Sequence, residues 1–232
     1  MSFQKVIAID GPSGSGKSTI AKLLAKNLNV LYIDTGAMYR AIACWCDLKN
    51  IEIKESADFD NFVENLDLKY GVNDQVLVQV DGEDLTQKIR EHHISKLASI
   101  VSQVPSVRKK LLILQRELGE QRVCVMEGRD IGSVVFPNAF IKFFVTASVE
   151  IRAQRRLNQL AENGDTSNTL EQIKKDVEDR DDKDANREVS PLIKSEDAEL
   201  VDTSDLTTDQ TIELLREKVL AKAESANIQI SS

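Results

Sequence analysis

The chain has 232 residues, enough for one domain with a sizeable core, and its 41% hydrophobic and 29% charged residues are ordinary for a globular enzyme. Its net charge of −8 argues against general binding to nucleic acid, because proteins that bind nucleic acid usually carry a basic surface. No apolar run is long enough to span a membrane and no signal-peptide pattern is visible, so we expect a cytoplasmic protein with no membrane partner.

Strands alternate with helices along most of the chain. Short apolar runs predict strands, and apolar residues spaced three and four apart predict helices. The predicted strands cover residues 6–10, 31–34, 123–126, 141–145 and 200–202. The predicted helices cover residues 17–28, 37–49, 107–118, 148–162 and 209–225. This alternation is typical of a parallel sheet that is covered by helices on both faces.

Two stretches interrupt the alternation. Residues 66–86 contain short runs of alternating polarity, separated by Asn73-Asp74 and Asp81-Gly82. Such pairs are typical of hairpin turns, so we expect a small antiparallel sheet in this stretch. Residues 158–191 are densely charged, and they predict two helices joined by a polar loop.

The cysteines and histidines do not form a metal-binding pattern. Cys44 and Cys46 are separated by one residue, which is too close for half of a zinc site. His92 and His93 are adjacent, and Cys124 is far away in the sequence. Buried or incidental thiols are therefore favoured over a metal centre.

A phosphate-binding loop (P-loop) follows the first predicted strand. Residues 11–18 read Gly-Pro-Ser-Gly-Ser-Gly-Lys-Ser and match G-x-x-x-x-G-K-[ST] at every fixed position. Glycines let backbone N–H groups turn toward phosphate oxygens, Lys17 supplies positive charge, and the Ser18 hydroxyl can ligate Mg²⁺. An accidental match is the alternative, but the loop lies between a predicted strand and a predicted helix, as the motif requires. The motif indicates a nucleoside triphosphate with Mg²⁺, and it does not name the acceptor.

Several arginines fall where they could surround a second anion, as phosphoryl transfer between two anions requires. Arg129-Asp130 follow a predicted strand, at the sheet edge where ligands bind in open α/β folds. On each of two later predicted helices, several charged residues lie on one face. They are Arg152, Arg155 and Arg156 on the first helix, and Arg180, Asp184 and Arg187 on the second. For each helix face alone, a solvated surface held by ion pairs remains an alternative.

Five segments resemble the bacterial-type cytidylate kinases, which are P-loop nucleoside monophosphate kinases. The segments are residues 9–18, 34–40, 98–108, 127–137 and 180–187, in the order that the family has them. The Gly-Arg-Asp-Ile-Gly and Arg-Asp-Asp-x-Asp-x-Asn-Arg segments are more specific than the P-loop. The resemblance implies an α/β P-loop kinase fold with a five-stranded parallel sheet flanked by helices, a small antiparallel nucleotide-binding insert and a helical lid.

The resemblance also implies how the chain is organised and what it binds. Residues 1–232 would form a single P-loop kinase domain, with a core of residues 1–60, 105–150 and 190–232. The monophosphate-binding insert would cover about 61–104, and the lid about 151–189. ATP and CMP or dCMP would be the small-molecule substrates and Mg²⁺ the cofactor. We expect no nucleic-acid partner, and we expect a monomer.

The reaction implied by the resemblance is transfer of the γ-phosphoryl group of ATP to CMP or dCMP. The implied catalytic residues are Lys17, Arg129 and Arg187. The implied ATP contacts are Gly11, Pro12, Ser13, Gly14, Ser15, Gly16, Lys17, Ser18, Thr19, Arg152 and Arg156, with Ser18 also on the metal. The implied CMP contacts are Thr35, Arg40, Ser99, Arg108, Arg129, Asp130, Arg180, Asp184 and Arg187.

Three of these residues, Ser99, Arg108 and Asp130, would face the cytosine. Cytosine donates from its N4 amino group and accepts at N3 and O2, which suits a carboxylate beside a guanidinium and a hydroxyl. Uracil reverses donor and acceptor at two positions, so an ionised Asp130 would reject UMP. Two departures from the family stand out: Glu127 replaces the commoner Asp beside the Mg²⁺ region, and Thr35 replaces the commoner Ser while keeping the hydroxyl.

Two other functions remain open. One is a P-loop kinase for a different small acceptor, such as another nucleotide or a cyclic polyol acid. The other is a nucleotide-gated binding protein that hydrolyses ATP slowly and transfers nothing. ADP release measured with different acceptors would separate these functions from a cytidylate kinase.

Overall fold

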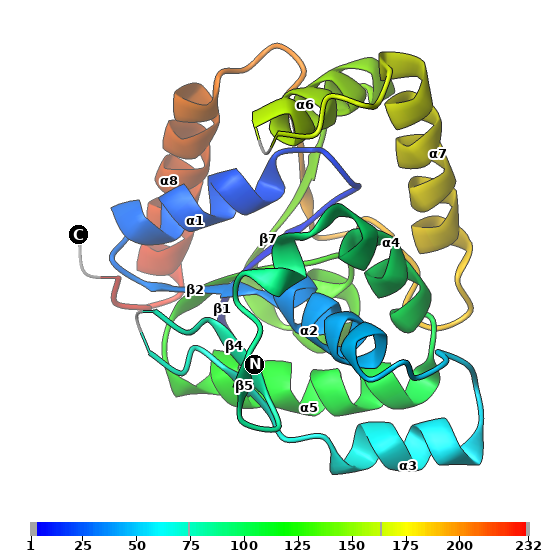
Figure 1. Ribbon diagram of the computed structural model, residues 1–232. Helices are drawn as coiled ribbons and strands as arrows, with labels where there is room; N and C mark the ends of the chain where they lie inside the picture. Colours follow the sequence, from blue (N-terminus) through cyan, green and yellow to red (C-terminus); the bar gives the residue numbers. More distant parts are fainter. Residues whose placement is uncertain (1–3, 74, 163, 231–232) are drawn as a thin grey trace. The chain divides into compact units, whose positions relative to one another are not determined.

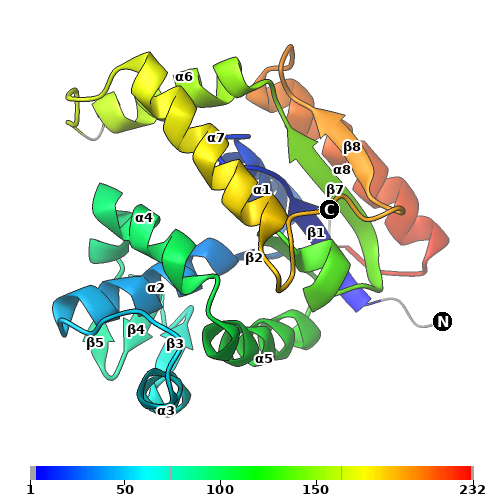
Figure 2. The ribbon, with the colours of Figure 1, turned by 90° about the vertical axis from the view of Figure 1, so that its right-hand side faces the viewer.

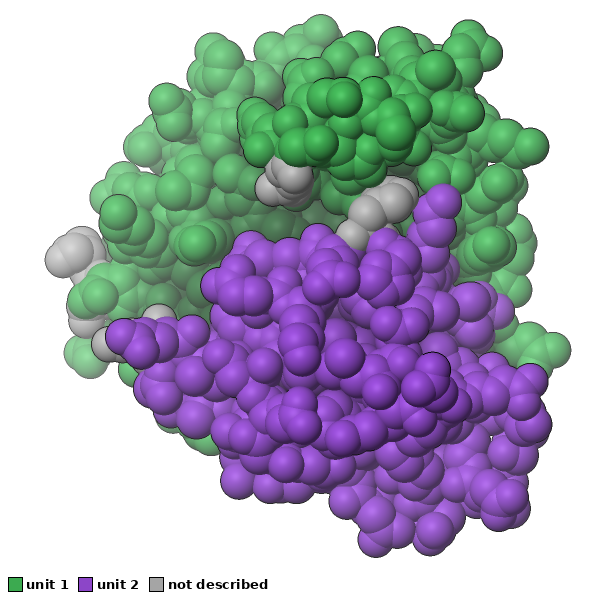
Figure 3. All heavy atoms as spheres, in the orientation of Figure 1, with its two compact units in different colours: residues 1–33, 118–232 green, residues 34–117 purple. Residues whose placement is uncertain are grey.

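A five-stranded parallel sheet organises the larger part of the computed structural model, which describes residues 4–73, 75–162 and 164–230 (Figure 1). The chain divides into two units, coloured separately in Figure 3. Residues 1–33 and 118–232 form what we call the P-loop unit, and residues 34–117 form the inserted unit. None of the described helices is both long and apolar enough to cross a bilayer.

The parallel sheet has the strand order β2-β6-β1-β7-β8. The strands are β1 (Gln4–Asp10), β2 (Leu31–Asp34), β6 (Cys124–Glu127), β7 (Ala139–Thr146) and β8 (Glu199–Asp202). The central strand β1 is fully buried from Val6 to Ile9, as expected of a parallel strand covered on both faces. Ile9 is in register with Glu127 on one side and Phe143 on the other, so the carboxyl ends of three strands meet at one edge. The predicted five-stranded parallel sheet is confirmed.

Four helices belong to the P-loop unit. They are α1 (Lys17–Asn27), α6 (Val149–Glu162), α7 (Leu170–Asn186) and α8 (Thr208–Ser225). α1 and α8 share one core with the sheet, in which Leu24 and Leu215 are completely buried. α6 and α7 pack side by side around a small core of their own, formed by Ala153, Leu160, Ile173 and Val177 (Figure 2). The predicted helix pair in the charged stretch is confirmed.

The inserted unit contains the predicted antiparallel sheet, with strand order β3-β4-β5. Its strands are shorter than the sequence runs suggested: β3 (Leu68–Tyr70), β4 (Val78–Val80) and β5 (Glu83–Asp84). Asp81 and Gly82 both have positive φ, 48° and 86°, which is the backbone that a two-residue hairpin turn requires. In the other predicted turn, Asp74 lies outside the described residues.

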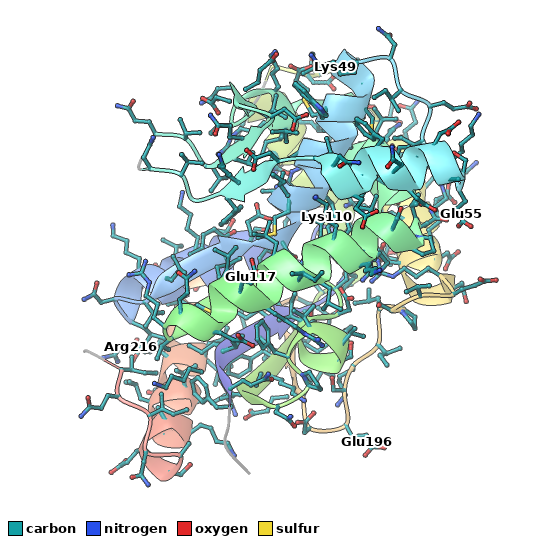
Figure 4. The ribbon with its side chains drawn as sticks, turned by 90° about the horizontal axis from the view of Figure 1, so that it is seen from below. Lys49, Glu55, Lys110, Glu117, Glu196 and Arg216 are labelled. Carbon is teal, nitrogen blue, oxygen red and sulfur yellow. The ribbon has the colours of Figure 1, made fainter. Side chains whose placement is uncertain are left out.

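Helices make up most of the inserted unit. They are α2 (Thr35–Leu48), α3 (Ala57–Asn65), the 3-10 turn η1 (Lys88–Arg90), α4 (His92–Val101) and α5 (Pro105–Gln121), the last of which ends in the P-loop unit. α2 begins two residues earlier than expected because the Asp34 carboxylate caps it, accepting a hydrogen bond from the Ala37 N–H. Figure 4 shows Lys110 on α5, where its ammonium donates to the Glu64 carbonyl of α3 at 2.9 Å.

Candidate active site

The P-loop joins the buried end of β1 to the first turn of α1. Gly11, Gly14 and Gly16 have φ of 151°, 74° and 82°, a region that glycine enters without steric cost. At Gly11 the space is also closed, because a Cβ there would lie 2.0 Å from the carbonyl oxygen of Val145. The glycine pattern of the motif is therefore required by this backbone path.

Lys17 opens α1 and is nearly buried, with 5% of its surface exposed. Its ammonium donates a hydrogen bond to the Pro12 carbonyl at 3.0 Å, which folds the side chain over its own loop. Burial lowers the pKa of Lys17 to about 7, and the nearby Arg129 guanidinium lowers it further. A bound polyphosphate would bring negative charge beside Lys17 and raise its pKa again. The next residue, Ser18, is exposed.

Arg129 lies at the carboxyl end of β6, and its guanidinium bonds to a carboxylate of α7. Nε of Arg129 donates to Oδ2 of Asp184 at 2.9 Å, and Nη1 donates to the Gly128 carbonyl at 3.1 Å. Burial alone would lower the pKa of Arg129, but the charge and hydrogen bond of Asp184 outweigh it and raise that pKa. Burial would likewise raise the pKa of Asp184, but the neighbouring Arg129, Arg180 and Arg187 hold it below the usual value. Both groups stay ionised at neutral pH.

Arg187 lies just past the end of α7, between two carboxylates. One guanidinium nitrogen is 3.6 Å from Oδ1 of Asp130, and the other is 3.8 Å from Oδ1 of Asp184. Its Nε donates to the Ser190 carbonyl, and the side chain is 5% exposed. The structure therefore brings the pair Arg129 and Asp130 together with the pair Asp184 and Arg187, although the two pairs are more than 50 residues apart in sequence.

Asp10 supports this cluster and was not among the predicted site residues. Its carboxylate accepts hydrogen bonds from the N–H groups of Ile131 at 2.9 Å and Gly132 at 2.7 Å. These donors begin the π-helical turn η2 (Ile131–Val135), directly after Arg129-Asp130. Burial raises the pKa of Asp10 to about 6, against the opposing effect of its two hydrogen bonds. An acidic residue that closes an otherwise apolar strand is the sequence signal that could have identified it.

Arg152 and Arg155 of α6 both contact backbone carbonyls of the P-loop. Arg152 donates to the Ser13 carbonyl at 3.0 Å and to the Ala147 carbonyl at 2.9 Å. Arg155 donates to the Ser15 carbonyl at 3.3 Å and to the hydroxyl and carbonyl of Thr203. Arg156, by contrast, bonds to Gln159 on the exposed side of the same helix. The three arginines therefore do not share one set of partners. Arg155 contacts the P-loop but was not among the predicted ATP contacts.

Four further predicted residues, Thr35, Arg40, Ser99 and Arg108, belong to the inserted unit. Arg40 donates to Asp34 at 2.8 Å, and the neighbouring Thr35 is buried. Arg108 donates to the Ser102 carbonyl at 3.1 Å, with its guanidinium 5.6 Å from the centre of the Tyr39 ring. The predicted residue Ser99, on α4, holds a buried hydroxyl that has no hydrogen-bond partner among the described residues. A buried polar atom in that state suits contact with a ligand.

The oxygen donors near the P-loop fit a metal that takes most of its ligands from phosphates and water. Ser18 presents an exposed hydroxyl at the start of α1. Glu127 is buried at the end of β6, where the Tyr32 hydroxyl donates to it at 3.1 Å. Within residues 4–73, 75–162 and 164–230 there is no group of three or more His, Cys, Asp or Glu side chains that could hold a metal ion alone. This donor set suits Mg²⁺, which commonly uses one or two protein oxygens beside nucleotide phosphates.

Comparison with known proteins identifies the family. Residues 7–221 match the family model described as Cytidylate kinase. A cytidylate kinase of Desulforamulus reducens is 43% identical over 212 residues, covering 91% of this chain and 95% of that protein. A cytidylate kinase of Caldanaerobacter subterraneus subsp. tengcongensis is 45% identical over 213 residues, covering 92% and 93%. The resemblance predicted from the five sequence segments is confirmed: the chain belongs to the cytidylate kinase family.

Proposed function

We propose that this chain transfers the γ-phosphoryl group of ATP to CMP or dCMP, giving ADP and CDP or dCDP. It is a kinase by family, and the P-loop supplies the triphosphate site that such a reaction needs. The observation that carries the proposal is the charge cluster beside that loop. Arg129 and Arg187 are held by Asp184 at the sheet edge where Lys17 opens α1.

The P-loop and the following turn are proposed to hold the phosphates of ATP. Backbone N–H groups of residues 11–19 would surround the phosphate oxygens, except at Pro12, which has none, and at Ser13, whose N–H donates to Asp181. Lys17 would contribute a full positive charge once ATP binds. Arg152 and Arg156 remain predicted ATP contacts. The hydrogen bond from Arg152 to the Ser13 carbonyl favours an indirect action of Arg152, through the shape of the loop.

Arg129 and Arg187 are proposed to bind the acceptor phosphate and to stabilise charge on the transferring group. Phosphoryl transfer depends mainly on position and charge, and guanidinium groups that are already fixed need little reorganisation when charge develops. Arg40 is proposed to share the acceptor phosphate, and Thr35, Arg180 and Asp184 to contact the sugar. The pairing of Asp184 with two arginines would then link sugar and phosphate binding.

Ser99, Arg108 and Asp130 are proposed to select cytosine. Asp130 would accept from the N4 amino group, while Arg108 and Ser99 would donate to N3 and O2. The hydroxyl of Ser99 is already buried, and the guanidinium of Arg108 is held against the Tyr39 ring. These positions would discriminate between bases by leaving a polar atom unpaired when uracil is present.

Ser18 is proposed to ligate Mg²⁺, with Glu127 close to the metal's water shell. When bound, Mg²⁺ neutralises part of the negative charge on the phosphate oxygens. The Tyr32 hydroxyl would hold the longer Glu127 side chain in place. The α6–α7 pair is proposed to be a lid that keeps water from the phosphates, within the predicted lid at about residues 151–189.

ADP release tests the function with a panel of acceptors: CMP, dCMP, UMP, AMP and no acceptor. We expect fast release with CMP or dCMP and slow release with every other addition. Release that favours a different acceptor would replace the proposed substrate. Release that is the same without any acceptor would identify a nucleotide hydrolase, and the proposal would be wrong.

A further inference from the structure

Asp181 of α7 forms a contact with the P-loop that the proposed catalytic and binding roles do not use. Its Oδ1 accepts a hydrogen bond from the backbone N–H of Ser13 at 3.1 Å. Its Oδ2 pairs with Arg152 of α6, and Arg152 donates to the carbonyl of the same Ser13 at 3.0 Å. One ion pair, from the two helices of the lid, therefore holds both backbone polar groups of a single P-loop residue.

The surroundings make this contact rigid. The Arg152 side chain is 6% exposed, and a further bond from its Nε to the Ala147 carbonyl fixes the guanidinium plane. The backbone of Arg152 also packs against the P-loop, where a Cβ on Gly14 would lie 2.9 Å from the Arg152 carbonyl oxygen. A charged hydrogen bond that is shielded from water in this way is stronger than one at the surface.

Asp181 also lies one turn before Asp184 on the same helix. Residues three apart on a helix lie on one side of it. Asp184 bonds to Arg129 at the end of β6, while Asp181 bonds to Ser13 after the end of β1. α7 is thus attached at two points, one on the loop proposed for ATP and one on the arginine proposed for the acceptor phosphate.

We propose that Asp181 is a positioning residue for phosphoryl transfer. By bonding to Ser13, it fixes α7 relative to the P-loop, and with it the acceptor contacts Arg180, Asp184 and Arg187. This inference rests on the proposed function of the site. Asp181 contacts neither substrate in this role, and it acts through the helix that carries the residues which do.

Electrostatics separates this role from a simple contribution to ATP binding. A carboxylate next to a polyphosphate site repels the ligand, so removing it should leave ATP affinity unchanged or improve it. Loss of position should instead lower the rate of transfer, because small displacements of reacting groups are costly. A fall in kcat without a rise in the KM for ATP is therefore the expected signature.

Asp181→Ala and Asp181→Asn test the inference, with Asp182→Ala as the matched control. Asp182 is the next residue on α7, carries the same charge and is exposed. We expect Asp181→Ala to lower kcat with CMP on the order of 10- to 100-fold without raising the KM for ATP. Asp181→Asn keeps an oxygen for the Ser13 N–H and should lose less. Asp182→Ala should stay within about twofold of the unsubstituted protein.

Melting temperatures of all variants show whether each is folded. If Asp181→Ala does not fold, the kcat and the KM for ATP of Asp181→Asn test the inference instead. The inference is overturned if kcat matches that of Asp182→Ala, or if the only change is a higher KM for ATP. A kcat above that of the unsubstituted protein would also overturn it, since the carboxylate would then obstruct ATP. All of these results concern the variants. The proposed function would be contradicted by a different result, namely that the unsubstituted protein shows no CMP-dependent turnover.

Discussion

Two sets of predicted ligand contacts, one from each unit, are held in different ways. In the P-loop unit, Arg129 is hydrogen-bonded to buried Asp184 and Arg187 forms an ion pair with it, so both charges are held in place before any ligand is present. In the inserted unit, Ser99 keeps a buried hydroxyl for which the described part of the chain offers no partner. Transfer of a phosphoryl group needs charges fixed in advance, whereas recognition of a base needs polar atoms that can still bond to it.

This comparison predicts different kinetic defects in the two units. Substitutions in the charge cluster should mainly lower kcat, because the cluster acts on charge that develops during transfer. Substitutions at Ser99 should mainly raise the KM for CMP. Asp130 is the exception that tests this division between effects on kcat and effects on the KM for CMP. It lies in the P-loop unit and pairs with Arg187, but we propose that it recognises the base.

The largest effect is expected for Arg129→Ala. Loss of a guanidinium that contacts the transferring phosphate should lower kcat by about three orders of magnitude. Steady-state assays with CMP measure this, and the melting temperature should change little. Arg129→Lys is the matched control: it keeps the charge without the planar fork and should recover only part of the rate. Near-normal turnover of Arg129→Ala would show that the assignment is wrong.

A smaller effect, on base choice, is expected for Asp130→Asn. The amide can donate to a uracil carbonyl, so the preference for CMP over UMP in kcat/KM should fall by about 100-fold. The measurement is kcat/KM for both nucleotides with the same preparation. If the preference is unchanged while kcat falls for both nucleotides, Asp130 acts on Arg187 and not on the base. Asp130 would then belong with the residues of the P-loop unit that affect kcat.

Ser99→Ala should have a moderate effect confined to binding. The KM for CMP should rise by about tenfold or less, with kcat nearly constant, because one hydrogen bond to the base is lost. Stability should not fall, since the hydroxyl makes no bond within the described residues. Ser133→Ala is a suitable control, because Ser133 has a buried hydroxyl of the same kind in the P-loop unit. Equal effects of both substitutions on the KM for CMP would contradict the role of Ser99.

The smallest effect concerns proton uptake by Lys17. Its pKa of about 7 in the absence of nucleotide leaves it mostly neutral at about pH 8, and bound phosphates should raise that pKa. ATP binding should then take up close to one proton at about pH 8, and less at about pH 6, where Lys17 is already protonated. Calorimetry in buffers with different ionisation enthalpies measures the uptake. The same uptake in Lys17→Met would show that another group binds the proton.

Much of the fold could be predicted because its signals are local. The P-loop and all five strands of the parallel sheet are visible as apolar runs and glycine spacing. Two short helices, α3 and α4, were not predicted, although Ser56 caps α3 and the apolar Ile94, Ala98 and Val101 recur at helical spacing in α4. The alternating run before the Asp81-Gly82 turn covers residues 75–80, but the ladder pairs only Val78–Val80, so alternation alone overstates the length of this strand.

The site could be predicted only in part, because several of its contacts join distant segments. Ser13 and Asp181 are 168 residues apart, and Asp10 is 121 residues from Ile131. No periodicity or local motif encodes such pairs. Arg152 shows the same limit: the family resemblance implied a contact with ATP, whereas its observed partners are the P-loop backbone, the Ala147 carbonyl and Asp181.

Transfer of label from ATP tests the central claim most directly. With ATP labelled on its γ-phosphoryl group, Mg²⁺ and CMP, we expect the label to appear in CDP, in an amount equal to the ADP formed. Label that appears as inorganic phosphate, or never reaches a cytidine nucleotide, would contradict the account.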